Sequence, residues 1–431
     1  MGAAGPGGTV HLTATAIRRR YLGLIGLRWF STGLLIPIFS LLMLTRGLSL
    51  VEIGLVAATQ GLVILVLELP TGGLSDALGR RPVLILASVT AILALAMLFL
   101  AQTVALFVMA AVVMGIFRAL DSGPLEAWYV DATLVAAPGS RIEAGLAAGG
   151  TVLSLAIAGG ALLSGGLVAL DPFENVETFA LPVLVALAVA VVNLGAVALL
   201  LSETRPAQGL RAVASSIRAV PRVVREGVGL LRSSRILLAL VSVELFWGFA
   251  IVAFESLFPI RLAEVVGGTI KAGALMGPAS SGAWFAAAGG AAVIAIVTRR
   301  TGVARAAIAL RILQGATIVA MGLLAGAVGL ITAYLACYVA HGASNPMHTT
   351  LLHREVDSQH RTTVLSLNSM VFHPAAAIGA LALTSIASAA SLATAMVVGG
   401  IVCAVAAPLY IPALRAERRR QAASPFEGTS P

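Results

Sequence analysis

Long apolar runs, separated by short polar segments, follow one another along the whole chain. A run of about 18 or more apolar residues can cross roughly 30 Å of hydrocarbon as an α-helix. Hydrophobic residues make up 59% of the 431 residues and charged residues only 11%, which excludes a soluble protein of two or three domains. We therefore expect an all-α membrane protein of about twelve spans. The expected spans cover residues 21–44, 53–72, 82–101, 104–128, 144–170, 178–201, 236–260, 274–297, 304–325, 327–349, 363–385 and 389–412.

The basic residues indicate the orientation of these spans. Most of the 28 Lys and Arg residues lie in alternate loops and in the two tails, and only Arg46, Arg261 and Lys271 lie in loops of the opposite side. Because cytoplasmic loops carry an excess of Lys and Arg, both termini are expected in the cytoplasm and the protein in the cell membrane. The net charge of +9 does not indicate a nucleic-acid partner, since the arginines lie between apolar spans and not on a soluble basic module.

The longest polar interruption divides the spans six and six. The segments "SGPLEAWYVDATLVAAPGSRIEAGL" (122–146) and "SNPMHTTLLHREVDSQHRTTVLSL" (344–367) occupy equivalent places in the two halves. Such six-helix repeats are typical of alternating-access carriers. The expected organisation is a cytoplasmic tail at 1–20, a six-helix bundle at 21–201, a cytoplasmic central loop at 202–235, a second six-helix bundle at 236–412 and a cytoplasmic tail at 413–431.

The central loop has the pattern of an amphipathic helix. Four arginines share one helical face, and an apolar stripe lies on another. We expect this helix to lie on the inner leaflet and to attract anionic lipids; the alternative is a solvated linker. The arginines are Arg218, Arg222, Arg225 and Arg232, and the stripe is Ile217, Val220, Val224, Val228 and Leu231.

One charged loop, "LELPTGGLSDALGRRPVLIL" (67–86), lies between the second and third spans. It resembles the loop 2–3 signature of the major facilitator superfamily, G-x-L-a-D-r-x-G-r-k-x-x-l, with Ala77 in place of the first basic residue. The matching residues are Gly72, Leu74, Ser75, Asp76, Gly79, Arg80, Arg81 and Leu84. The resemblance extends over essentially the whole chain and implies two six-helix bundles that rock around a central cavity lined by spans 1, 4, 7 and 10.

The resemblance also implies a role for this loop. In the family it acts as a latch that favours the outward-facing state, which assigns that role to Gly72, Asp76, Gly79, Arg80 and Arg81. The two arginines can reach an acid at the end of span 4, such as Asp131. The alternative is a structural turn whose arginines extend toward the membrane surface.

Two further features have weaker counterparts in the family. Arg118 followed by Gly123 resembles the fourth-span motif R-x-x-q-G with one extra residue before the glycine. Span 5 lacks the Gly-Pro pair of the antiporter signature, so antiport cannot be inferred from it. In the second half, "VTRRTG" (297–302) keeps the basic pair and the glycine of the loop 2–3 signature but has lost the acid.

Acids inside spans are candidates for proton coupling, because an ionisable side chain there costs at least about 2.5 kcal/mol on insertion scales. The candidates are Glu68, Asp121, Glu126 and Glu244. Glu68 lies beside Pro70, which frees a backbone carbonyl; it could instead serve gating or structure. Glu68, Asp121 and Glu126 are possible partners of Arg28 in span 1. Asp121 can instead pair with Arg118 three residues earlier, which would make both structural.

Other polar and aromatic residues are expected to line the cavity: Arg28, Arg118, Trp247, Glu255, His341, Asn345 and His373. In span 7, an acidic and aromatic stripe that includes Trp247 and Glu255 suits a cation with an apolar body. The alternative places Glu255 at the outer interface and makes Trp247 a packing residue. His341 and His373 could provide pocket polarity or relay protons, and the histidine spacing does not indicate a metal site.

The chain has no Walker A, GxSxG or HExxH motif, so we expect neither an enzyme nor a cofactor. The sequence favours a monomeric secondary transporter that exports small amphipathic or cationic compounds in exchange for protons. The alternatives are proton-linked uptake of a small metabolite and a receptor or assembly factor on the same fold.

Overall fold

The computed structural model describes residues 12–173, 175–202, 209–357 and 360–423, and this part of the chain is helical without strands. The first half contains α1 (Ala14–Leu35), α2 (Phe39–Thr45), α3 (Leu50–Leu78), α4 (Arg80–Leu100), α5 (Val104–Leu120), α6 (Pro124–Ala136), α7 (Glu143–Leu170) and α8 (Ala180–Leu200). After α9 (Leu210–Ser233), the second half contains α10 (Arg235–Glu255), α11 (Leu257–Val266), α12 (Thr269–Thr301), α13 (Val303–Leu323), α14 (Ala327–Arg354), α15 (Arg361–Ala389), α16 (Leu392–Val405), η2 (Ala407–Tyr410) and α17 (Ile411–Ala423).

Twelve helical spans are long and apolar enough to cross a membrane, which confirms the expected number. Helices extend into both segments that were expected to be tails. Helix α1 begins at Ala14 and not near residue 21, because the Thr13 side chain caps it by accepting a hydrogen bond from the Ala16 N–H at 3.3 Å. The last span continues through α17 to Ala423, since that segment is rich in the good helix formers Ala, Arg and Glu.

Spans 4 and 7 are each broken into two helices near their middle. In span 4, α5 ends at Leu120 and α6 begins at Pro124, with Gly123 between them at φ +93°. Glycine adopts this left-handed conformation easily because it has no Cβ atom, and proline suits the first turn of the new helix. In span 7, α10 ends at Glu255 and α11 begins at Leu257. The breaks place Asp121 and Glu255 beside helix ends.

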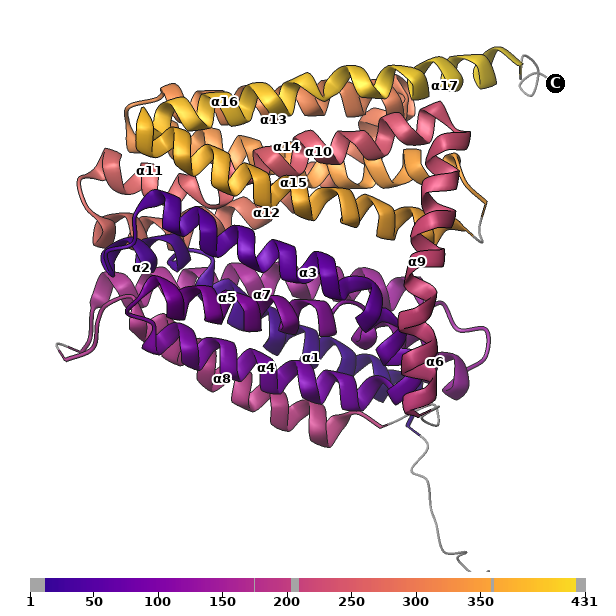
Figure 1. Cartoon of the computed structure of the whole chain (residues 1–431), viewed down its shortest axis with the longest axis horizontal. Coiled ribbons are helices and arrows are strands. Elements are labelled where there is room, and N and C mark those ends of the chain that lie inside the picture. Colours follow the sequence, from indigo (N-terminus) through magenta and orange to yellow (C-terminus); the bar gives the residue numbers. More distant parts are fainter. Residues whose placement is uncertain (1–11, 174, 203–208, 358–359, 424–431) are drawn as a thin grey trace, which may run out of the picture.

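The two halves lie side by side, and α9 connects them at one end of the molecule (Figure 1). We call this the linker end; α6 and α17 also lie there, whereas α2 and α11 lie at the opposite end. Helix α9 packs against α3 of the first half and against α10 and α15 of the second. It occupies the place expected for the amphipathic helix, and its Arg218, Arg222, Arg225 and Arg232 are exposed.

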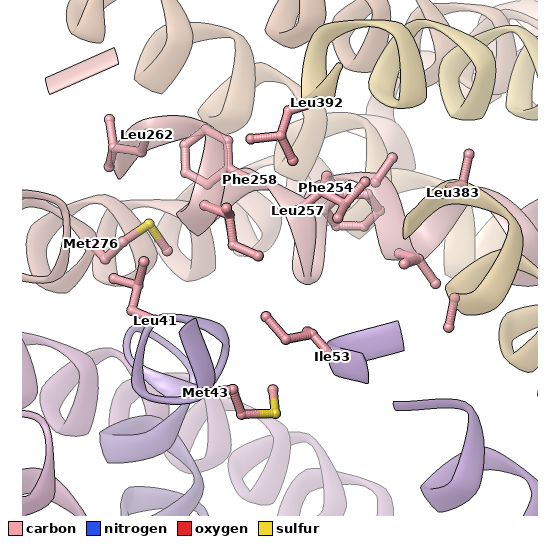
Figure 2. Close-up of a cluster of buried hydrophobic side chains, with 14 of the residues drawn as sticks. Leu41, Met43, Ile53, Phe254, Leu257, Phe258, Leu262, Met276, Leu383 and Leu392 are labelled. Atoms are coloured by element: carbon pink, nitrogen blue, oxygen red, sulfur yellow. The ribbon is translucent and has the colours of Figure 1, made fainter. Parts of the chain in front are cut away.

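An apolar core joins the halves at the end that carries α2 and α11, which we call the sealed end (Figure 2). Leu41 and Ile53 from the first half belong to the same buried cluster as Phe254 and Phe258 from the second. Fully burying a side chain of this size stabilises a structure by about 1.5–3 kcal/mol. At the linker end, the buried clusters around Trp128 and around Tyr410 each belong to one half. The halves are therefore held together by apolar packing mainly at the sealed end.

Small residues bring the halves close where α7 meets α12. A Cβ atom on Gly165 would lie 2.6 Å from the Cα of Gly277, and the reverse holds for Gly277. Such contact between backbones is how membrane helices pack without large side chains. Substituting either residue would push α7 and α12 apart.

Candidate functional site

A cavity of about 380 Å³ lies between the two halves. It is lined by residues of α1, α3, α5, α6 and α15, and by the break between α5 and α6. Six of the residues predicted from the sequence line it: Arg28, Glu68, Arg118, Asp121, Glu126 and His373. The cavity is thus built mainly from the first half, and α15 closes it from the second.

The cavity wall contains a nearly buried ion pair between Arg28 of α1 and Asp121 at the end of α5. Their side chains are only 11% and 5% exposed. The Arg28 guanidinium also lies 4.2 Å from the ring centroid of Trp29, and the Arg118 guanidinium lies 5.3 Å from the same ring. Asp121 thus pairs with Arg28 across two helices, which is one of the two pairs that the sequence allowed for it; Arg118 was the other candidate.

Two charged side chains of the cavity have no ion-pair partner within 4 Å among the described residues. Arg118 interacts electrostatically at longer range with Asp121 and with Glu255 of the other half. Glu126 is exposed and lies in the first turn of α6, where the helix dipole favours an anion. Arg118 and Glu126 are therefore the cavity charges most available to a bound molecule.

Glu68 links the two halves at the level of the cavity. The Ser369 hydroxyl of α15 lies 2.8 Å from each carboxylate oxygen of Glu68 and donates to them. His373, one helical turn further along α15, places its Nε2 atom 3.8 Å from Glu68. This polar contact joins α3 to α15 where apolar packing no longer does so.

A second polar cluster lies inside the second half and does not line the cavity. His348 of α14 places Nε2 at 3.0 Å from Asn368 Oδ1 and 3.2 Å from Glu244 Oε1, and Nδ1 at 3.0 Å from the Tyr410 hydroxyl. The Arg311 guanidinium of α13 lies 3.5 Å from the same hydroxyl. We call these five residues the C-half network.

The chemistry of the C-half network fixes the direction of its hydrogen bonds. Two oxygen acceptors near His348 Nε2 require a proton on that nitrogen, so in the neutral ring Nδ1 accepts from the Tyr410 hydroxyl. Arginine can only donate, so Arg311 donates to the Tyr410 oxygen. Donors therefore point in one direction, from Arg311 through Tyr410 and His348 to Glu244. Arg311 also donates to Gln314 Oε1, at 3.0 Å.

The stripe predicted in span 7 divides between two environments. Trp247 is buried, with the Arg311 guanidinium 4.9 Å and the His341 ring 5.1 Å from its ring centroid. Glu255 is exposed at the end of α10, and Asn345 is exposed on α14. Neither these two residues nor Trp247 and His341 are among those that line the 380 Å³ cavity.

The loop that resembles the family latch turns at Gly79, whose φ is +96°. Arg80 reaches Asp131 of α6, with 3.1 Å between Nη2 and Oδ2, which is the contact expected from the sequence. Arg81 donates to the Ala198 carbonyl of α8 at 2.8 Å. Gly72 lies within α3, and the side chain of Asp76 lies outside what the structure describes.

Sequence reasoning missed several polar residues of the site. Arg311 is an arginine inside a span, and the insertion cost that singled out Glu68 would also have singled it out. Tyr410 and Asn368 carry no such signal, because neutral polar residues are common in transmembrane helices. Ser369 carries no such signal either, and its bond to Glu68 depends on how the halves meet.

Twelve spans in two halves, with a polar cavity between them and a sealed end, define the class of secondary transporters that work by moving two bundles. The chain belongs to the major facilitator superfamily, whose sequence profile matches residues 22–380. It is a non-enzymatic membrane transporter. Comparison with curated proteins gives no significant match.

Solved structures of other transporters share this fold. The nucleoside transporter NupG superposes with a TM-score of 0.74 at 13% identity, covering 92% of this chain and 98% of that one. A bacterial homologue of the human lysosomal transporter Spinster gives 0.73 at 15% identity, with 93% and 97% covered. A POT family transporter in complex with 5-aminolevulinic acid gives 0.70 at 16% identity, with 91% and 95% covered.

Proposed function

We propose that this transporter exports small amphipathic compounds with a cationic group, and that each transport cycle is coupled to protons. The observation that carries the proposal is Glu68, an acid in the membrane that lines the cavity and binds Ser369 of the other half. A hydroxyl binds an ionised carboxylate more strongly than a neutral one. Protonation of Glu68 therefore weakens one contact between the halves, which is what coupling requires.

The charge of the cavity supports a cationic group on the substrate. Three carboxylates and two guanidinium groups line it, so negative charge is in excess when His373 is neutral. Arg28 neutralises Asp121, which leaves Glu126 as the acid available to a substrate amine. Trp29, Ile25 and other apolar side chains of the wall offer contact to an apolar body.

The transport cycle alternates between a state with the apolar core of the sealed end intact and one in which that core opens. In this structure the core is intact, so substrate exchange takes place toward the linker end. The Arg80–Asp131 pair holds α4 and α6 together at that end, and it acts as the latch when the halves close there.

The linker end faces the cytoplasm of the cell, with both termini on that side. The exposed arginines of α9 support this orientation, because basic residues concentrate in cytoplasmic segments. Helix α9 attracts anionic lipids of the inner leaflet through the same residues. The carrier functions as a monomer, since each chain contains both halves and its own cavity.

The test is proton movement in vesicles that contain the purified protein and hold a pH gradient, challenged with a panel of lipophilic cations. Proton movement triggered by a cation, and accumulation of that cation against its gradient, would support proton-coupled export. If no cation moves protons, the export proposal is rejected. If no solute of any class moves, the receptor or assembly-factor alternative is favoured.

A second candidate function is proton-linked uptake of a small metabolite that carries both a cationic and an anionic group. The observation that favours it is Arg118, a cavity guanidinium without an ion pair among the described residues, on the same wall as Glu126. Uptake of labelled amino acids and short peptides into the same vesicles would test it. Arg118→Gln should abolish uptake of such solutes and leave export of purely cationic compounds intact.

A further inference from the structure

A second hollow, of about 280 Å³, lies at the linker end of the second half, away from the transport cavity. It is formed where the end of α12, the start of α13, the end of α14 and α17 meet. Five arginines line it: Arg299, Arg300, Arg305, Arg354 and Arg418. We call it the arginine pocket. It contains "VTRRTG", the segment whose acid is missing compared with the loop of the first half.

The acid that the segment lacks is supplied by Glu417 of α17. Its carboxylate accepts hydrogen bonds from the Val303 and Ala304 N–H groups, both at 3.2 Å, and from Arg354 at 3.0 Å. Gly302, at φ +81°, allows this approach, because a Cβ there would lie 3.0 Å from Glu417 Oε2. The carboxylate of Glu417 is therefore already bound to the start of α13 and to Arg354.

Four arginines of the pocket remain without compensation. Arg299, Arg300, Arg305 and Arg418 are exposed and make no ion pair with any residue that the structure describes. Like charges gathered from α12, α13 and α17 around one hollow repel each other, and a bound anion relieves that repulsion. The positive-inside rule accounts for arginines on this side of the membrane, but not for their convergence on a pocket.

We propose that the arginine pocket binds the phosphate group of an anionic phospholipid. Guanidinium groups match phosphate oxygens in charge and in planar donor geometry. The pocket lies where span 8 ends and span 9 begins, which is the level expected for the lipid headgroups. Beside it on α12, Ile296 is 67% and Val297 40% exposed, so a lipid seated in the pocket has apolar surface for its acyl chains. That surface favours a lipid over a soluble phosphate compound.

The proposal is independent of the transported substrate and is tested by binding. The full chain is purified in detergent and titrated with phosphatidylglycerol or phosphatidylcholine, and bound lipid is counted by native mass spectrometry. Arg299→Gln/Arg305→Gln/Arg418→Gln removes three charges from the pocket. The matched control, Arg18→Gln/Arg19→Gln/Arg141→Gln, removes three exposed charges from the first half at the same end and leaves α9 and the pocket intact. Retained melting temperature establishes that each variant is folded.

Phosphatidylglycerol should bind the native protein about tenfold or more tightly than phosphatidylcholine, and the pocket variant should lose that preference. The control variant should keep it within about twofold. Equal losses in both variants would overturn the proposal in favour of a diffuse positive surface. Binding of inorganic phosphate that displaces the lipid and depends on the pocket arginines would overturn the lipid assignment. A matched Arg→Lys variant that retains full affinity would contradict the role of the planar donors.

Discussion

The two halves each hold a buried arginine and a buried acid, but they use them differently. In the first half, Arg28 and Asp121 pair directly in the cavity wall, and Arg118 and Glu126 beside them have no ion pair among the described residues. In the second half, Tyr410 and His348 connect Arg311 to Glu244, and no member of that network lines the cavity. The comparison teaches that the first half has charges available to a substrate, whereas the second half has neutralised its own.

The largest expected effect comes from breaking the buried pair of the first half. Asp121→Asn leaves Arg28 as an uncompensated charge, which should destabilise the protein by about 3–5 kcal/mol and strongly lower its melting temperature. The double variant Arg28→Gln/Asp121→Asn should recover most of this loss. Equal melting temperatures for the native protein and the single variant would show that the pair is not what holds α1 to α5.

The corresponding change in the second half should lower the free energy of unfolding by less. Tyr410→Phe removes the hydroxyl that joins Arg311 to His348, and a buried group left unsatisfied costs about 1–3 kcal/mol. Substrate affinity should stay within about twofold, because the network does not line the cavity. Tyr129→Phe is the control, since its hydroxyl makes no hydrogen bond with a described residue and its loss should be nearly neutral. A large loss of affinity in Tyr410→Phe would place the network in the substrate site.

Glu126, the cavity acid without an ion pair among the described residues, should affect substrate binding more than stability. Glu126→Gln should change stability by less than about 0.5 kcal/mol, because Glu126 is exposed. It should weaken binding of a cationic substrate about tenfold, since one charge-assisted contact is lost. The measurement is equilibrium binding of the same cation to Glu126→Gln and to Glu244→Gln. If Glu244→Gln weakens binding more than Glu126→Gln, the comparison of the halves is wrong.

The smallest expected effect concerns the loop at the linker end. Arg80→Gln removes the mostly buried contact with Asp131 and should favour the state open at that end by a factor of a few. Both native cysteines are buried, so a cysteine at exposed Ser122 in the cavity can report accessibility alone. Its labelling rate should rise in Arg80→Gln. An unchanged or lower rate would remove the latch role from this pair.

Much of the fold followed from the sequence, because span length and the six-and-six division are properties of composition along the chain. The contact between Arg80 and Asp131 could also be predicted, because the loop signature places Arg80 and the end of span 4 places Asp131. The C-half network was not, because Arg311 and Tyr410 are 99 residues apart and meet only through packing of spans 9 and 12. The partner of the "VTRRTG" segment was missed for the same reason: Glu417 lies in a part of the chain that was expected to be a tail.

The most direct test of the account is transport by Glu68→Gln in vesicles, measured in two ways on the same preparation. The variant mimics a permanently protonated acid, so accumulation of a cationic substrate driven by a pH gradient should be lost. Exchange of labelled for unlabelled substrate across the membrane, which needs no net proton movement, should continue. Gradient-driven accumulation at the native rate in Glu68→Gln would contradict the proposal that Glu68 couples protons to transport.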